Sequence, residues 1–155
     1  MQKYSSRVVG FSGVRKLGRV QTATVKQSLN AYFQAKQWVM GDARGVDSLV
    51  LAVAEIEKIE YKQFCVEHNR GPWSFSDRSI RMVDYLESVN GILVAFPNKP
   101  CPSCCVPRIY PSGGGSGTWL TIAAARHRGL EIEIHPIAKG IDLPQWLTHT
   151  QLRLF

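Results

Sequence analysis

The chain has 155 residues, of which 45% are hydrophobic and 20% charged, and it carries a formal net charge of +7. This length and composition are typical of one globular domain and exclude a disordered chain. The sequence has no apolar run near the roughly 18 residues of a membrane-spanning helix and does not begin like a secretory signal. We therefore expect a cytoplasmic protein.

The positive charge is concentrated at the start of the sequence. Of the 19 basic residues, seven precede the first acidic residue, Asp42, so the remaining 12 balance the 12 acidic residues. A basic segment of this kind suits an anionic partner, either a nucleotide phosphate or a nucleic-acid backbone. A solvated helix face would give the same pattern, and the charge alone does not separate these readings.

Apolar runs alternate with helical patterns along the chain. Strands are predicted over residues 7–13, 37–41, 61–66, 91–96 and 130–135, and helices over 20–36, 45–58, 76–88 and 116–128. The second helix has one apolar stripe, formed by Val46, Leu49, Val50, Val53 and Ile56. The run 91–96 is the most continuous one, as in a central parallel strand, whereas 130–135 alternates and predicts one wetter face.

This order of elements predicts an α/β fold. We expect a Rossmann-like, doubly wound and mainly parallel sheet of five strands or slightly more, with helices on both faces. One domain is expected over 1–155, with its core at about 7–135. The tail, 136–155, is expected to pack back on the sheet or to contact a partner subunit, and we expect a homodimer or a higher homo-oligomer.

Ligands of such sheets bind beyond the carboxyl ends of the strands, so the loops that follow the strands are examined first. In "GFSGVRK", Gly13 allows a tight turn, and Arg15 with Lys16 places positive charge at the end of the first strand. In "FSDRSIRM", Arg78 begins a helix, where the helix dipole disfavours a basic side chain. A residue that opposes local preference indicates a ligand, although pairing with Asp77 would also explain it.

The loop "GDARGVD" connects the second strand to the second helix. Gly41 and Gly45 permit a close approach of the backbone, and Arg44 can form two hydrogen bonds with a phosphate or a carboxylate. Asp47 falls in the first turn of the helix, where an acidic residue is favourable in any protein. The same carboxylate could accept hydrogen bonds from a ribose.

The segment "GGGSGT" lies between the most apolar strand and an apolar helix. It is neither a Walker A loop nor a G-x-G-x-x-G fingerprint. It could nevertheless bind a phosphate as those loops do, because glycines let successive N–H groups point into one concavity and the helix adds the positive end of its dipole. The predicted phosphate-binding residues here are Gly113, Gly114, Gly115, Ser116, Gly117 and Thr118.

Taken in order, "GDARGVD", "DRSIRMVDYL", "ILVAFP" and "GGGSGTWLTIAAARHRGLEIEI" resemble the SMF/DprA–LOG (SLOG) superfamily of Rossmann-like domains, in particular its small stand-alone YspA-like members. The resemblance covers about residues 7–135. It implies that a nucleotide or a nucleotide derivative binds in a pocket formed by 41–47, Arg78 and 113–118. The proline–glycine–glycine usual in the family is interrupted here by "NKPCPSCCVPRIYPS", which could cover the pocket or contact a partner.

Two further functions are implied by the same resemblance. LOG enzymes cleave the N-glycosidic bond of nucleoside monophosphates with an arginine, matched by Arg78, and a glutamate, whose place is taken by Thr121 or a neighbour. Because "GTWLTIAAA" has no acid, binding or sensing is expected rather than hydrolysis, and Asp47 and Glu67 are the carboxylates that could substitute.

A DprA-like protein would bind single-stranded DNA. The basic first segment agrees with that function, and stacking aromatic side chains would be expected as well. Trp73, Phe75 and Trp119 lie near the site loops, although all three are more often core residues.

The four cysteines leave a metal site open. Cys65 with His68 and Cys101 with Cys104 would form a Cys-x2-His plus Cys-x2-Cys set for zinc. Against this set, Cys65 falls in a predicted core strand, where a free cysteine behaves as a small hydrophobe. We favour a reducible disulfide or an inert loop at "CPSCC", and we expect no metal or other cofactor to be required.

Overall fold

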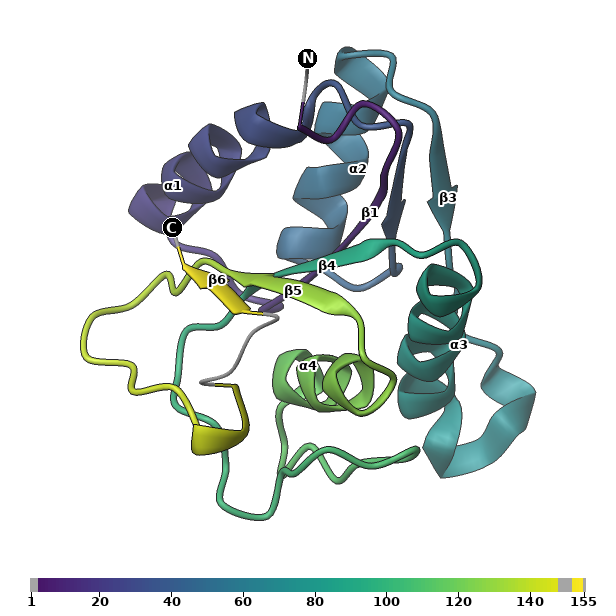
Figure 1. Ribbon diagram of the computed structural model, residues 1–155, viewed down its shortest axis with the longest axis vertical. Helices are drawn as coiled ribbons and strands as arrows, with labels where there is room; N and C mark the ends of the chain where they lie inside the picture. The colour runs from purple at the N-terminus through teal and green to yellow at the C-terminus, as the bar shows by residue number, and fades with distance from the viewer. Residues whose placement is uncertain (1–2, 148–151, 155) are drawn as a thin grey trace.

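The computed structural model describes residues 3–147 and 152–154 and shows an α/β fold with an all-parallel sheet (Figure 1). The six strands lie in the order β3-β2-β1-β4-β5-β6, and each pair of neighbours is parallel. Their bounds are β1 Val8–Gly13, β2 Gln37–Met40, β3 Tyr61–Gln63, β4 Ile92–Phe96, β5 Glu131–Ile134 and β6 Leu152–Leu154. The predicted fold class is therefore confirmed, and the order of the strands is that of a Rossmann-like sheet.

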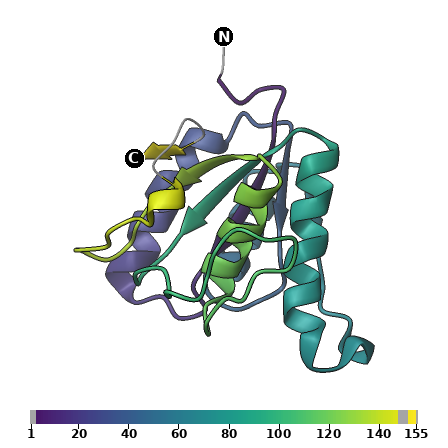
Figure 2. The ribbon, with the colours of Figure 1, turned by 60° about the horizontal axis from the view of Figure 1, so that its bottom comes forward.

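Helices cover both faces of the sheet. In Figures 1 and 2, α1 (Arg19–Leu29) and α2 (Val46–Ile56) lie on one face, and α3 (Ser74–Ser88) and α4 (Gly117–His127) lie side by side on the other. Three short 3-10 helices complete the described elements: η1 Asn30–Tyr32, η2 His68–Trp73 and η3 Gln145–Leu147. None of the described helices has both the length and the apolar character needed to cross a membrane.

The core is divided into two apolar clusters, one on each face of the sheet. Alternate residues of β1 and β4 point to opposite faces, so Val9 and Ile92 pack under α1 and α2, whereas Val8 and Leu93 pack under α3 and α4. Every residue of β4 is buried, which explains why its sequence is the most apolar run of the chain.

Several boundaries differ from the prediction. The helix expected over 20–36 ends at Leu29 and continues only as η1, because the next turn tightens to 3-10 geometry. The strand expected over 61–66 has three residues, and Ile56 is 77% exposed rather than part of the buried stripe of α2. In the tail, β6 adds a strand to the edge of the sheet, while residues 148–151 and 155 lie outside the described residues.

The expected wetter face of β5 is wrong. Glu133 is fully buried, and its carboxylate accepts hydrogen bonds from the hydroxyl groups of Tyr4, at 2.9 Å, and Tyr32, at 2.7 Å. The Tyr32 hydroxyl also lies 2.9 Å from Nε2 of His135. A buried carboxylate is tolerated here because these partners supply the hydrogen bonds that water would otherwise provide.

Candidate functional site

A cavity of about 670 Å³ lies at the carboxyl ends of β1 and β4. Gly13 at the end of β1 is level with Phe96 at the end of β4. The chain leaves β1 toward α1 on one face and leaves β4 toward α4 on the other, so the two connections diverge and form a crevice. The lining comprises residues 11–16, 41, 43, 47, 78, 79, 82, 97–99, 115–119 and 121.

Two predicted glycines hold the loop after β1 against the start of α2. Gly45 has a φ of +74°, and a Cβ there would lie 2.2 Å from the carbonyl oxygen of Val14. The N–H of Val46 donates to the same oxygen at 3.0 Å. A Cβ at Gly13 would lie 2.4 Å from Cγ2 of Val46. Gly13 therefore lines the cavity, whereas Gly45 acts behind it by allowing two backbone segments to touch.

Positive charge enters the cavity from the loop after β1. Arg15 and Lys16 both line it. The guanidinium of Arg15 lies 4.9 Å from the ring centroid of Phe75, a cation–π contact that orients the side chain. Phe75 is 47% exposed and Trp73 is 74% exposed, so the expectation of core positions is wrong for these two residues and correct for Trp119.

Asp47 is a buried carboxyl group in the cavity wall. The residue is 7% exposed, and its Oδ2 accepts a hydrogen bond from the N–H of Ala43 at 3.1 Å. Burial raises the pKa of Asp47 to about 6, although the positive charge of Arg78 and the backbone hydrogen bonds oppose the shift. A Cβ at Gly41 would lie 2.6 Å from Oδ2 of Asp47, so only glycine leaves room for this carboxyl group.

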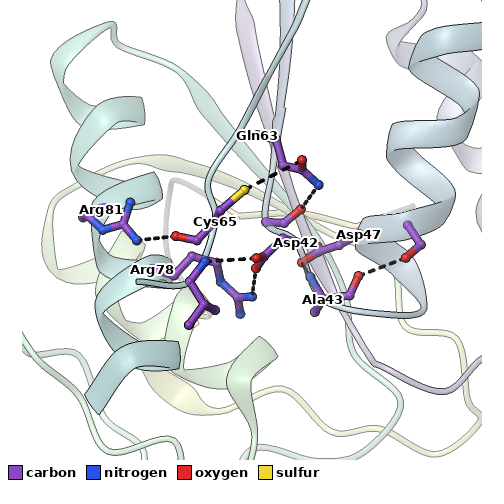
Figure 3. Close-up of polar contacts among 10 residues, drawn as sticks. Asp42, Ala43, Asp47, Gln63, Cys65, Arg78 and Arg81 are labelled. Atoms are coloured by element: carbon purple, nitrogen blue, oxygen red, sulfur yellow. Dashed lines mark hydrogen bonds and ion pairs between the residues drawn. The ribbon is translucent and has the colours of Figure 1, made fainter. Parts of the chain in front are cut away.

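Arg78 lines the cavity and is tied to the loop after β2 (Figure 3). Its Nη1 donates to Oδ1 of Asp42 at 2.8 Å, and the other oxygen of Asp42 accepts from the N–H of Val66 at 3.0 Å. Desolvation alone would raise the pKa of Asp42, but these two hydrogen bonds outweigh it and lower the pKa below its ordinary value. The expected pairing of Asp77 with Arg78 is wrong, because Asp77 pairs with Arg81 at 2.9 Å.

The glycine-rich segment ends at the first turn of α4. Ser116 is the N-cap, and its hydroxyl accepts from the N–H of Trp119 at 3.1 Å. The N–H of Leu120 donates to the carbonyl of Ser116, which leaves the N–H groups of Gly117 and Thr118 as those the helix itself cannot satisfy. A Cβ at Gly117 would have no neighbour within 4 Å, so this backbone borders open space.

The structure assembles most of the predicted ligand-binding residues around the cavity. Those in its wall are Gly13, Arg15, Gly41, Asp47, Arg78, Gly115, Ser116, Gly117 and Thr118. Arg44, Gly45, Gly113 and Gly114 are not in the wall. Gly114, with a φ of +56°, packs against Pro102 and Cys104 instead, so it shapes the loop. Glu67 is also outside the wall and lies 3.9 Å from Arg81.

Some cavity residues were missed by the sequence analysis, Asn98 and Lys99 among them. Asn98 and Lys99 follow β4 directly and line the cavity, and the carbonyl of Lys99 accepts from Nε1 of Trp119 at 2.8 Å. The rule that sites lie beyond strand ends would have found them. They were overlooked because the segment 98–112 was interpreted as one insertion. Thr121 also lines the cavity and donates to the carbonyl of Gly117 at 2.8 Å.

The alternative zinc set is not brought together. Across residues 3–147 and 152–154, no three His, Cys, Asp or Glu side chains are placed to hold a metal ion. Cys65 is exposed beyond the end of β3, so its expected core position is wrong, and Cys101 and Cys104 lie on the loop after β4. All four cysteines are free thiols.

Comparison with protein-family models, with curated proteins and with solved structures gives no match to this chain.

Proposed function

We propose that the cavity binds a nucleotide or a nucleotide derivative, with a phosphate group at the N-terminus of α4. The observation that carries the proposal is the charge of the wall. Four basic side chains line it, Arg15, Lys16, Arg78 and Lys99, and Asp47 is the one carboxylate among the lining residues. Only Arg78 of the four forms an ion pair within the described part of the chain. The other three cations are available to an anion.

The α4 end of the cavity has the donors that a phosphate requires. The N–H groups of Gly117 and Thr118 lack intrahelical acceptors, and the positive end of the helix dipole adds to their attraction for an anion. The Ser116 hydroxyl already accepts from Trp119, so its own proton remains to be donated. Backbone amides, a hydroxyl and lysine side chains together form the usual donor set for phosphate oxygens.

Asp47 and the size of the cavity suit the rest of a nucleotide. The carboxylate of Asp47 has Ala43 as a donor to one oxygen, which leaves acceptor capacity for a ribose hydroxyl. The volume of about 670 Å³ lies within the range of small-molecule sites and is large enough for a nucleotide. A bare phosphate would leave most of the cavity empty.

Calorimetric titration with a panel of nucleotides, ADP-ribose derivatives and the matching phosphate-free nucleosides tests the proposal. We expect binding of at least one phosphorylated compound and no measurable binding of its nucleoside. Lys16→Ala should weaken binding by about tenfold, the usual loss for one charge-assisted hydrogen bond. The matched control is Lys36→Ala, which removes the same charge from an exposed position outside the cavity. Equal affinities for the two variants, or no binding by any compound, would contradict the proposal.

Asp47 supports a second candidate function, hydrolysis of the N-glycosidic bond of a nucleotide. A buried carboxyl with a pKa of about 6 can exchange a proton near neutral pH, as a general acid or base requires. Chromatography would detect the free base released from nucleoside monophosphates. For hydrolysis, Asp47→Asn should abolish release while leaving binding within a few-fold. Intact nucleotide after prolonged incubation would leave binding as the function of the site.

A further inference from the structure

The loop between β4 and α4 carries three cysteines in the segment "CPSCC", and the proposed function uses none of them. The N–H of Cys105 donates to the carbonyl of Pro102 at 2.9 Å and closes a tight turn that contains Cys104. The sulfur of Cys101 lies 3.5 Å from the carbonyl oxygens of both Pro102 and Cys105. The Cys101 thiol is therefore folded over the turn that carries Cys104.

The three thiols differ in access to solvent. Cys105 is 1% exposed and donates to the carbonyl of Trp119 at 3.4 Å. Burial raises the pKa of Cys105 to about 12, and Cys101 and then Cys104 add to the shift. Burial also raises the pKa of Cys101, where a hydrogen bond with Cys105 opposes the shift and Cys104 adds to it. Cys104 is exposed. A dissolved oxidant therefore meets Cys104 first, while Cys101 is partly buried and Cys105 is shielded.

We propose that Cys101 and Cys104 form an oxidation site for hydroperoxides, in which Cys104 reacts first and Cys101 closes a disulfide. In the first step the Cys104 thiolate attacks one peroxide oxygen, an S–O bond forms and the O–O bond breaks. Cys104 becomes a sulfenic acid, and the peroxide is reduced to water or an alcohol. In the second step the Cys101 thiol gives up its proton and attacks the Cys104 sulfur, the S–S bond forms and the S–O bond breaks. The leaving hydroxide takes up that proton and becomes water.

The oxidation site is in direct contact with the glycine-rich segment. The sulfur of Cys104 lies 3.8 Å from Oγ of Ser112, and a Cβ at Gly114 would lie 2.8 Å from that sulfur. We expect the Cys104 sulfur to leave this contact when it bonds with Cys101. Gly114 lies in the turn that the N–H of Ser116 closes on the carbonyl of Gly113 at 2.9 Å. Disulfide formation therefore removes a support of the turn that leads into α4.

This contact gives the oxidation a consequence for the cavity, and that part of the inference rests on the proposed function. Gly115, Ser116, Gly117 and Thr118 line the cavity and follow the turn that Cys104 supports. We expect the oxidised protein to bind inorganic phosphate several-fold more weakly than the reduced protein. Because the disulfide itself needs no ligand, its formation is measured independently of binding.

The first experiment treats the full chain with hydrogen peroxide and measures the intact mass and the peptide that contains all three cysteines. We expect the loss of two hydrogens from that peptide, reversed by a dithiol. The loss should disappear in Cys101→Ser and Cys104→Ser, and persist in Cys105→Ser and in Cys65→Ser, the control for an exposed thiol elsewhere. A sulfinic acid without a disulfide, or a disulfide that requires Cys105, would overturn the inference.

The second experiment compares the reduced and oxidised proteins by amide hydrogen exchange and by titration with inorganic phosphate. We expect faster exchange at Gly114–Ser116 and weaker phosphate binding after oxidation, and no change in Cys104→Ser. Unchanged exchange and affinity in a fully disulfide-bonded protein would overturn the link to the cavity. If neither form binds phosphate or any nucleotide, the proposed function fails, while the mass and exchange data still decide the oxidation site.

Discussion

At the residue scale, the cavity wall holds a carboxyl group whose ionisation opposes folding. The pKa of Asp47 rises from its ordinary value of 3.8 to about 6, chiefly because the group is buried. The folded protein therefore binds a proton more tightly than the unfolded chain does. The contribution of the Asp47 carboxyl group to the free energy of unfolding is fully present below pH 3.8 and is lost as the pH rises through 6.

Asp47→Asn should remove this pH dependence. We expect the free energy of unfolding of the wild-type protein, relative to that of Asp47→Asn, to fall by about 2 kcal/mol between pH 4.5 and pH 7.5. Urea unfolding of both proteins at the two pH values measures it. Asp84→Asn, a change of the same kind at a surface carboxylate beside Arg128, is the control and should show a much smaller difference. A constant difference between wild type and Asp47→Asn would contradict the pKa and its cause.

The sequence predicted which residue types meet at the cavity but not how they pair. Gly41, Asp47 and Arg78 follow from the rule that sites lie beyond strand ends. The alternative partner considered for Arg78 was its neighbour Asp77, whereas the partner in the structure is Asp42, 36 residues away. Such a pair depends on the distance between α3 and the loop after β2, and local sequence patterns do not indicate that distance.

At the element scale, the position of the loop after β1 depends on one glycine at the start of α2. Gly45 combines a φ of +74° with a Cβ position 2.2 Å from the Val14 carbonyl oxygen and 2.6 Å from the Arg15 carbonyl oxygen. Both obstacles are backbone atoms, which cannot turn away as a side chain can. Any side chain at this position has to separate the loop from α2.

Gly45→Ala should therefore destabilise the protein by at least about 3 kcal/mol, the sum of an unfavourable φ and a backbone clash. Gly140→Ala is the matched control, because Gly140 has a φ of +73° and a Cβ there would meet no atom within 4 Å. We expect about 1 kcal/mol for the control. Chemical denaturation of the two variants isolates the clash, and equal losses would show that Val14 and Arg15 move aside freely.

Sequence patterns located the elements well where burial and periodicity agree. All of β4 is buried, and Ile80, Val83 and Leu86, which recur at the three-residue spacing of one helix face, are buried on α3. The prediction failed at Glu133, because an alternating pattern assigns a charged residue to solvent. Its two tyrosine partners lie 129 and 101 residues away in the chain, so only the folded molecule shows that the face is buried.

At the scale of the whole molecule, a buried polar network joins the N-terminal segment, η1 and β5. The carboxylate of Glu133 accepts from Tyr4 and Tyr32, and Tyr32 is shared with His135, whose ring stacks on Phe96 at the end of β4. Burial also raises the pKa of Tyr32 far above its usual value, so its hydroxyl keeps its proton and remains a donor. The network thus links segments that apolar packing alone would leave free to shift.

His135 makes this network sensitive to acid. Burial lowers the pKa of His135 from 6.5 to about 4. At mildly acidic pH His135 is therefore protonated in the unfolded chain and neutral in the folded protein. Its contribution to stability is present above pH 6.5 and is lost as the pH falls toward 4, the opposite direction to that of Asp47. We expect the free energy of unfolding of the wild-type protein, relative to that of His135→Gln, to fall by about 2 kcal/mol between pH 7.5 and pH 5, because Gln keeps a hydrogen-bonding group without the titration. His127→Gln, at an exposed position on α4, should retain the loss, and identical pH profiles for the wild type and His135→Gln would refute the assignment.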